Sequence, residues 1–260
     1  MLITTIGSSS GCSTSLRDSA GIYIQSSKNI LLDCGEATNK FFLNRDVNEL
    51  DVVCITHAHL DHFIGLPMLL FHNLAIRNRT KPITIIMPET VWTFIEPFMD
   101  SYHLRMPFKY KCYIFKDNQA PHQWVFDDMI ITGYNVRHSM DSCYGYNVYD
   151  KSCNKNIVYT GDTEPFDSLS MLCDDTDLVI AEGTWASDYT GPRYGHSWVT
   201  EMIEAVDKSS ANKLVLTHLS QKYHSEDGYM IYSSDVMDAF QKCENLKRIY
   251  IAYDGMEIKI

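Results

Sequence analysis

The most informative stretch of the sequence is Ile55–Thr56–His57–Ala58–His59–Leu60–Asp61–His62, which places three histidines and one aspartate within six positions. It follows the apolar run 51–56, which predicts a short buried strand. It precedes residues 63–70, which predict a turn that enters a helix. The ligand-type side chains are therefore expected to crowd onto a corner between a strand and a helix.

Two separate points near this corner can receive side chains. His57 and His59 are two residues apart, so an extended backbone directs them to the same side. Asp61 and His62 lie beyond the bend and can face a second point nearby. The stretch can thus supply ligands to two adjacent metal ions, and imidazole with carboxylate favours zinc, manganese or iron over magnesium or calcium. The alternative interpretation is a polar turn that carries surface histidines.

Length and composition are those of an ordinary globular protein. The chain has 260 residues, enough for one large α/β domain that spans 1–260. Its first residues lack the basic region and apolar core of a signal peptide, and no apolar run approaches membrane-spanning length. The eight cysteines contain no C-x-x-C pair, which favours reduced thiols over a disulfide framework. We therefore expect a cytoplasmic protein without membrane contact.

The formal net charge of −11 bears on the choice of partner. Proteins that bind long nucleic acids normally carry a basic face, because neutralising phosphates supplies much of the affinity. A local basic groove is compatible with a negative total. The charge nevertheless favours a small substrate, or a very localised contact, over a long polyanion.

Strand-like runs recur along the chain, and two sets of apolar residues at helical spacing occur in the second half. The first set is Val199, Met202, Ile203 and Val206, with Ser197 as the expected N-cap. The second set is Val236, Met237 and Phe240. The order is β-rich first and then alternates strands with helices, which predicts central sheets covered by helices.

Three further ligand-type residues each follow an apolar run. They are His138, Asp162 and His218. A sheet delivers the residues beyond its strand ends to one edge, so these side chains can meet the corner at 55–62. Taken singly, each is compatible with a surface or turn residue; together they favour a two-metal site.

In these residues the chain resembles the metallo-β-lactamase superfamily, which implies a four-layer αβ/βα sandwich with metals at the sheet edge. By this resemblance one metal takes His57, His59 and His138, and the other takes Asp61, His62 and His218. Asp162 would bridge the two ions, for which zinc is the expected metal and manganese the alternative. Asp33 matches the aspartate that supports the ligand loop in the family.

The likeness is greater still to the RNase Z branch of that superfamily. The opening 7–11, the segment 181–185 and the segments 195–197 and 216–223 match the branch, although Ala181 stands where a histidine is usual. The resemblance implies that His196, oriented by Glu182, gives a proton to the leaving oxygen or stabilises charge in the transition state. With Asp162 and Asp61 these residues form the expected catalytic set, and the expected reaction is hydrolysis of a phosphodiester.

The substrate depends on an interval between two ligands. Enzymes of the RNase Z branch that process tRNA 3′ ends grip tRNA with an arm inserted between the residues that match His138 and Asp162. Here the interval 139–161 is long enough only for a hairpin. The chain thus looks like the armless phage anti-Pycsar group, which implies cleavage of cyclic mononucleotides and evasion of cyclic-nucleotide bacterial immunity. A tRNA 3′-processing endonuclease is the alternative, followed by another metallo-hydrolase.

Aromatic residues suggest a place for the base. Loop 184–198 contains Tyr189 and Tyr194, and we expect a mobile loop whose rings stack on a nucleobase; packing against the protein is the alternative. Ser220 and Tyr223 follow His218 closely and are further candidates for substrate contact. A second aromatic stretch, 102–126, is expected at a homodimer interface, as the family resemblance suggests.

Overall fold

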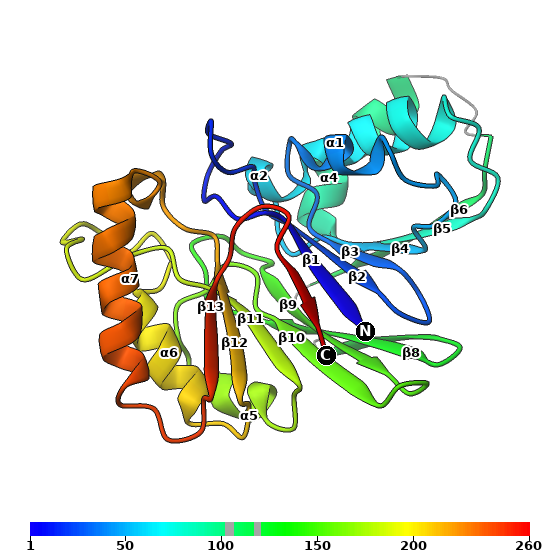
Figure 1. Cartoon of the computed structure of the whole chain (residues 1–260). Coiled ribbons are helices and arrows are strands. Elements are labelled where there is room, and N and C mark those ends of the chain that lie inside the picture. The colour runs from blue at the N-terminus through cyan, green and yellow to red at the C-terminus, as the bar shows by residue number, and fades with distance from the viewer. Residues whose placement is uncertain (102–106, 117–120) are drawn as a thin grey trace.

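Two β-sheets face each other, and helices cover the outer face of each sheet (Figure 1). This arrangement is seen in a computed structural model that describes residues 1–101, 107–116 and 121–260. The expected αβ/βα sandwich is confirmed. Part of the aromatic stretch 102–126, on which the homodimer expectation rested, lies outside the described residues.

The first sheet has seven strands, in which β1 and β2 pair antiparallel and β3 to β6 run parallel. Its order is β14 (Glu257–Lys259), β1 (Leu2–Gly7), β2 (Gly21–Gln25), β3 (Ile30–Leu32), β4 (Val52–Cys54), β5 (Ile83–Pro88) and β6 (Tyr110–Phe115). The helices that follow its strands are α1 (Thr38–Phe42), α2 (Leu60–Phe63), α3 (Gly65–Pro67), the π-helix η1 (Met68–Ala75) and α4 (Glu89–Ser101).

The second sheet also has seven strands, with β7 to β10 antiparallel and β10 to β13 parallel. Its order is β13 (Arg248–Ile251), β12 (Lys213–Thr217), β11 (Leu178–Glu182), β10 (Lys155–Tyr159), β9 (Tyr144–Asp150), β8 (Met129–Asn135) and β7 (His122–Phe126). The remaining helices are α5 (Leu169–Cys173), α6 (Val199–Asp207), the 3₁₀-helix η3 (Gln221–Tyr223) and α7 (Glu226–Phe240).

The central strands are apolar on both faces, because each sheet is covered on both sides. In β2, Ile22 and Ile24 enter the core between the sheets, whereas Tyr23 packs with the helices outside. In β12, Val215 faces the inter-sheet core, and its two neighbours Leu214 and Leu216 face α6 and α7. Alternation along the strands thus divides the apolar residues among three cores.

Both predicted helices are present. The N-cap of the first helix and the buried face of the second differ from the prediction. Helix α6 buries Val199, Met202, Ile203 and Val206. Its N-cap is Trp198 rather than Ser197, because the Ser197 hydroxyl donates to the carbonyl of Thr163 instead of to the helix.

Helix α7 differs more from the expectation. It buries Val236, but 62% of Met237 and 36% of Phe240 are exposed. The buried side of the helix instead contains Gly228, Tyr232, Val236 and Ala239. The buried face of α7 is therefore the one that repeats every three to four residues from Gly228. The cluster of apolar residues at 236–240 does not define it.

Parallel strands bring the carboxyl ends of β4, β10, β11 and β12 to one edge of the sandwich. The segments that begin there carry the corner 55–62, Asp162 and His218. Among the described residues, no helix is long and apolar enough to cross a membrane.

Candidate metal centre

The corner at 55–62 has the predicted form. Strand β4 ends at Cys54, His59 has extended dihedral angles (φ −75°, ψ 140°), and α2 begins at Leu60. Asp61 and His62 therefore lie on the first turn of a helix, beyond the bend that carries His57 and His59. All but His59 of these four ligand-type residues are buried.

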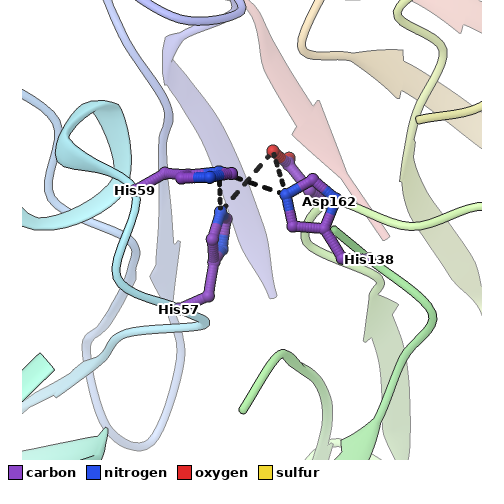
Figure 2. A group of neighbouring side chains, drawn as sticks. All are labelled: His57, His59, His138 and Asp162. Atoms are coloured by element: carbon purple, nitrogen blue, oxygen red, sulfur yellow. Dashed lines mark hydrogen bonds and ion pairs between the residues drawn. The ribbon is translucent and has the colours of Figure 1, made fainter. Parts of the chain in front are cut away.

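The first group of side chains gathers His57, His59, His138 and Asp162, with one potential ligand atom from each within 4.8 Å of the others. Figure 2 shows these four side chains pointing toward one another, His57 and His59 from one loop and His138 and Asp162 from two others. Nδ1 of His59 lies 3.0 Å from Nε2 of His57 and 3.1 Å from Nε2 of His138. Three imidazole nitrogens that converge in this way can share one divalent ion.

The second group lies beside the first and contains Asp61, His62 and His218. Nε2 of His218 is 3.2 Å from Nε2 of His62 and 3.3 Å from Oδ2 of Asp61. Oδ2 of Asp162 is 3.2 Å from Nε2 of His62, 3.3 Å from Nε2 of His218 and 3.7 Å from Nε2 of His57. Asp162 is therefore in reach of both groups.

Hydrogen bonds on the outer side orient the imidazole rings. Nδ1 of His62 donates to Oδ2 of Asp33 (2.8 Å), and Nδ1 of His138 donates to the carbonyl of Gly195 (2.8 Å). Nδ1 of His57 lies 2.9 Å from Oγ1 of Thr56, whose own proton goes to Asp33. These bonds leave each Nε2 lone pair directed into the site, as metal-binding histidines require.

His218 is oriented through Thr184. Nδ1 of His218 lies 3.1 Å from Oγ1 of Thr184, and that hydroxyl donates to Oε2 of Glu182 at 2.6 Å. The threonine therefore accepts from His218, which leaves Nε2 of His218 free for the site.

The environment of Asp162 is the feature of the site that best fits a cation. Asp162 is 2% exposed, yet neither of its carboxylate oxygens has a hydrogen-bond partner of adequate geometry. Burial raises the pKa of Asp162, but His218 and His62 hold that pKa well below its ordinary value. A buried carboxylate that accepts no hydrogen bond and lies among imidazole nitrogens completes the donor set of a divalent transition-metal site.

The electrostatics of the imidazoles agree with this set. Burial lowers the pKa of His57 well below its ordinary value, which keeps the ring neutral and able to ligate. Burial also lowers the pKa of His62, but Asp162, Asp61 and Asp33 together raise that pKa well above its ordinary value. Three carboxylates around one imidazole concentrate negative charge that a bound cation would neutralise.

A second functional pair adjoins the metal-type cluster. Nδ1 of His196 lies 3.1 Å from Oε1 of Glu182 and 3.9 Å from Oδ2 of Asp162. Burial lowers the pKa of His196, but the Glu182 carboxylate and the hydrogen bond to it raise that pKa more, to about 9. The carboxylate of Glu182 thus favours the protonated form of His196, which is the form that can donate a proton.

Glu182 itself is 1% exposed, and its carboxylate accepts hydrogen bonds from several residues. It accepts hydrogen bonds from the amide of Thr163 (2.6 Å) and the amide of Ser197 (3.1 Å), in addition to those from Thr184 and His196. A carboxylate held this firmly fixes the tautomer and direction of the His196 ring.

The four candidate substrate contacts differ in how exposed and how free their side chains are. Tyr194 is 63% exposed beside the site. Tyr189 stacks on Trp185 with ring centroids 3.7 Å apart, so one face of its ring is already covered. Ser220 caps η3 by accepting from the amide of Lys222. The expectation for Tyr223 is wrong: it is 0% exposed, its hydroxyl donates to Asp188 and accepts from the amide of Ala186, and it cannot reach a substrate.

Some residues that shape the site escaped sequence reasoning. The amide of Gly11 donates to Oδ2 of Asp61 at 2.8 Å, and Thr56 and Thr184 relay hydrogen bonds from ligand-type histidines. Gly195, at φ +78°, has no room for a side chain, since a Cβ would lie 2.7 Å from Nδ1 of His138. For Thr56, Thr184 and Gly195 the available signal was their proximity in sequence to His57, Glu182 and His196. Proximity did not specify these contacts, and Gly11 lies far from all three in sequence.

Comparison with known proteins fits this geometry. The sequence profile of the beta-lactamase superfamily domain matches residues 28–219. The ribonuclease Z of Agathobacter rectalis is 24% identical in an alignment of 276 positions that covers 87% of this chain and 89% of that relative. The ribonuclease Z of Brevibacillus brevis is 25% identical in an alignment of 289 positions that covers 88% of each chain. The crystal structure of the short form of human tRNase Z has a TM-score of 0.81 at 22% identity and covers 100% of this chain and 99% of its own, which shows a shared fold.

The chain belongs to the beta-lactamase superfamily domain family and is a hydrolase with the metallo-β-lactamase fold, whose cluster of histidines and aspartates indicates divalent metal ions. Within that superfamily it falls in the RNase Z-like branch, to which the matched relatives belong.

Proposed function

We propose that the chain is a phosphodiesterase that uses two divalent metal ions to hydrolyse cyclic mononucleotides. The observation that carries the two-metal part is Asp162, a buried carboxylate without hydrogen-bond partners in reach of both ligand groups. One ion would be held by His57, His59 and His138, and the other by Asp61, His62 and His218, with Asp162 shared. Imidazole-rich ligation favours zinc, and manganese would also suit the carboxylates.

When bound, the two ions activate water for attack and neutralise charge that develops on the phosphate. The protein side chains then have distinct tasks. Asp162 and Asp61 keep the ligand groups together and provide acceptors for the protons of the attacking water. His196, held by Glu182, donates a proton to the ribose oxygen that leaves phosphorus.

The structure of the interval between two ligands supports a small substrate. Residues 139–161 contain β9 and β10, which form an antiparallel hairpin, and the short segments that flank them. This interval has no protruding arm with which to grip a folded RNA. The formal net charge of −11 also disfavours an extended contact with a polyanion.

The alternative proposal is an RNase Z-type tRNA 3′-processing endonuclease. It is favoured by relatives named ribonuclease Z that align with most of this chain and most of their own length. The same metal groups and the same His196–Glu182 pair would serve that reaction, because it too expels a ribose oxygen from phosphorus.

We further propose a homodimer that acts in the cytoplasm, without membrane contact or long nucleic acid as a partner. Exposed apolar side chains on β6 and β7, at the edges of the two sheets, support a protein contact there: Tyr110 is 45% exposed, Ile114 40% and Val125 59%. Destruction of a cyclic-nucleotide signal would suit a phage that evades bacterial immunity.

A substrate panel tests the proposal. Zinc-loaded and manganese-loaded proteins are incubated with cyclic mononucleotides, cyclic dinucleotides and precursor tRNA at equal enzyme concentration. We expect rapid opening of a cyclic mononucleotide and slow or no cleavage of tRNA. Rapid tRNA cleavage with inert cyclic mononucleotides would establish the alternative, and inactivity on every phosphodiester would refute both.

A further inference from the structure

We propose that Arg193 is a positioning residue that holds His196 in place for proton donation, an inference that rests on the proposed phosphodiesterase function. Arg193 lies in the loop between β11 and α6, three residues before His196. Its backbone contacts His196, and its side chain fixes the loop to α6.

The backbone carbonyl of Arg193 is the first part of this arrangement. It accepts a hydrogen bond from the amide of His196 (3.1 Å) and another from Nε1 of Trp185 (3.4 Å). The ring of His196 is held from the other side by Glu182. The position of the imidazole therefore depends on where the Arg193 carbonyl lies.

The side chain of Arg193 is the second part. Its Nη1 and Nη2 donate to the two carboxylate oxygens of Glu201, both at 2.8 Å, and Glu201 is on the first turn of α6. The guanidinium carbon also lies 4.3 Å from the centroid of the Trp198 ring. A two-pronged ion pair combined with ring stacking fixes direction as well as distance, which a single charge cannot do.

The turn that joins Arg193 to His196 is the third part of this arrangement. Tyr194 and Gly195, between Arg193 and His196, adopt positive φ angles of +55° and +78°. The Gly195 carbonyl accepts from Nδ1 of His138, so this turn also touches a ligand-type histidine. Hydrogen bonds at Arg193, Gly195 and Trp198 attach this loop, for which the sequence predicts mobility, to the site and to α6.

The effect of losing Arg193 should depend on the leaving group. A ribose oxygen needs a proton as it leaves, whereas the p-nitrophenolate of bis(p-nitrophenyl) phosphate leaves readily without one. If Arg193 acts through His196, the substitution R193M should lower kcat about tenfold for a ribose phosphodiester, the scale of a small misplacement. It should leave kcat for bis(p-nitrophenyl) phosphate, KM and metal content nearly unchanged.

The ribose ester is whichever of cyclic mononucleotide and precursor tRNA the wild type cleaves. R193K retains the charge but loses the two-pronged geometry, so an intermediate kcat is expected. In an H196A background R193M should cause no further loss of kcat, because the two residues act in series.

A matched control is available in the other half of the molecule. Arg45 also pairs with a glutamate (Nη1 to Oε1 of Glu49, 3.3 Å) and lies over an aromatic ring, 4.1 Å from the centroid of Phe41. R45M should leave the ratio of the two kcat values at the wild-type level. Circular dichroism and thermal unfolding establish that R193M is folded.

Each outcome bears on one proposal. Equal losses of kcat on both substrates, unchanged kcat on the ribose ester, or additive losses with H196A would overturn the role of Arg193 while the proposed function stands. A wild type that cleaves the nitrophenyl ester but no ribose phosphodiester would refute the proposed function itself.

Discussion

At the scale of single residues, Asp33 shows how much of the site lies behind the ligands. Its Oδ1 accepts from the amide of Thr56 (2.8 Å), and its Oδ2 accepts from Nδ1 of His62 and from the hydroxyl of Tyr159 (both 2.8 Å). Its backbone adopts φ +60°, a conformation in which aspartate is tolerated better than most side chains. One buried carboxylate thus sets the direction of the His62 ring and the start of the ligand corner.

His196 gives the clearest separation of catalysis from metal binding. We predict that H196A retains the metal content of the wild type. The His196 ring lies within reach of Asp162 and His218, but its Nδ1 is hydrogen-bonded to Glu182 and both ligand groups are complete without it. The kcat on a ribose phosphodiester should fall ~10²-fold or more, as expected when a general acid is lost. Metal analysis and steady-state kinetics test this together. Parallel loss of metal and activity would mean that His196 is a ligand.

Tyr194 is the best placed of the aromatic candidates. Because it is 63% exposed beside His196, Y194A should raise KM for a cyclic nucleotide without changing kcat. Loss of one base-stacking contact costs about 1–3 kcal/mol, so a rise of roughly tenfold is expected. Tyr189 is a poorer test, because its stacking on Trp185 also supports the loop. An unchanged KM for Y194A would refute the stacking role.

The sequence could identify the ligand-type residues, but it could not assign all of their neighbours. The spacing of His57, His59, Asp61 and His62 limits how they can point, and the structure has the predicted bend. Tyr223 shows the limit of such reasoning. Its closeness to His218 in sequence suggested a substrate contact, whereas packing against Tyr232 of α7 buries it completely.

At the scale of secondary-structure elements, Asp150 connects the two sheets at the end of β9. Its carboxylate accepts from Ser26 and Ser27, which follow β2, and from Ser152 in the turn before β10. Burial raises the pKa of Asp150, but these hydrogen bonds lower it more, to below its ordinary value. A pKa lowered by folding means that the ionised group stabilises the fold above the unfolded pKa of about 3.9, and that this contribution is lost at lower pH.

We therefore predict that D150N lowers the free energy of unfolding by about 2 kcal/mol at pH 7. The deficit relative to wild type should narrow as pH falls from about 5 toward 2, because the wild-type carboxyl becomes protonated there. Urea unfolding of both proteins at several pH values measures this difference in the free energy of unfolding. D127N is the control. The Asp127 side chain is 81% exposed, so its ion pair with Lys28 should contribute little to the free energy of unfolding. A deficit that is independent of pH would contradict the role of the carboxylate charge.

The elements differ in how well local patterns define them. The stripe of α6 is unambiguous, since the four residues that the spacing selects are the four that the helix buries. In α7, Tyr232 and Gly228 pack inward and Met237 does not, because the hydroxyl of Tyr232 bonds to the carbonyl of Gly183 and sets the rotation of the helix. That choice depends on a contact from another element, which periodicity alone does not contain.

At the scale of the whole molecule, the site exists only where distant segments converge. The corner 55–62 follows the first sheet, whereas Asp162, Glu182 and His218 follow strands of the second sheet. Alternation of apolar residues predicts sheets and helices, but it does not specify which strand ends meet. The order of the ligand motifs, and the family resemblance it supports, supplied that part of the prediction.

The shape of the molecule also limits the substrate that we propose. The hairpin β9–β10 makes up most of the interval 139–161, in which an RNA-binding arm would be inserted. The ligand groups lie beside the loop 184–198, since Nδ1 of His138 donates to the carbonyl of Gly195. Discrimination between cyclic mononucleotide and tRNA therefore concerns surfaces around the metal-type cluster, since the cluster itself suits either phosphodiester.

The central claim is that Asp162 joins two metal ions into one hydrolytic site. The measurement that tests it most directly is the metal content per chain of wild type and D162A, determined with the phosphodiesterase rate on the same samples. We predict two ions per chain for the wild type, fewer for D162A, and a rate that falls by ~10²-fold or more, the scale on which metal activation of water acts. A D162A protein that keeps both ions and full activity would contradict the account.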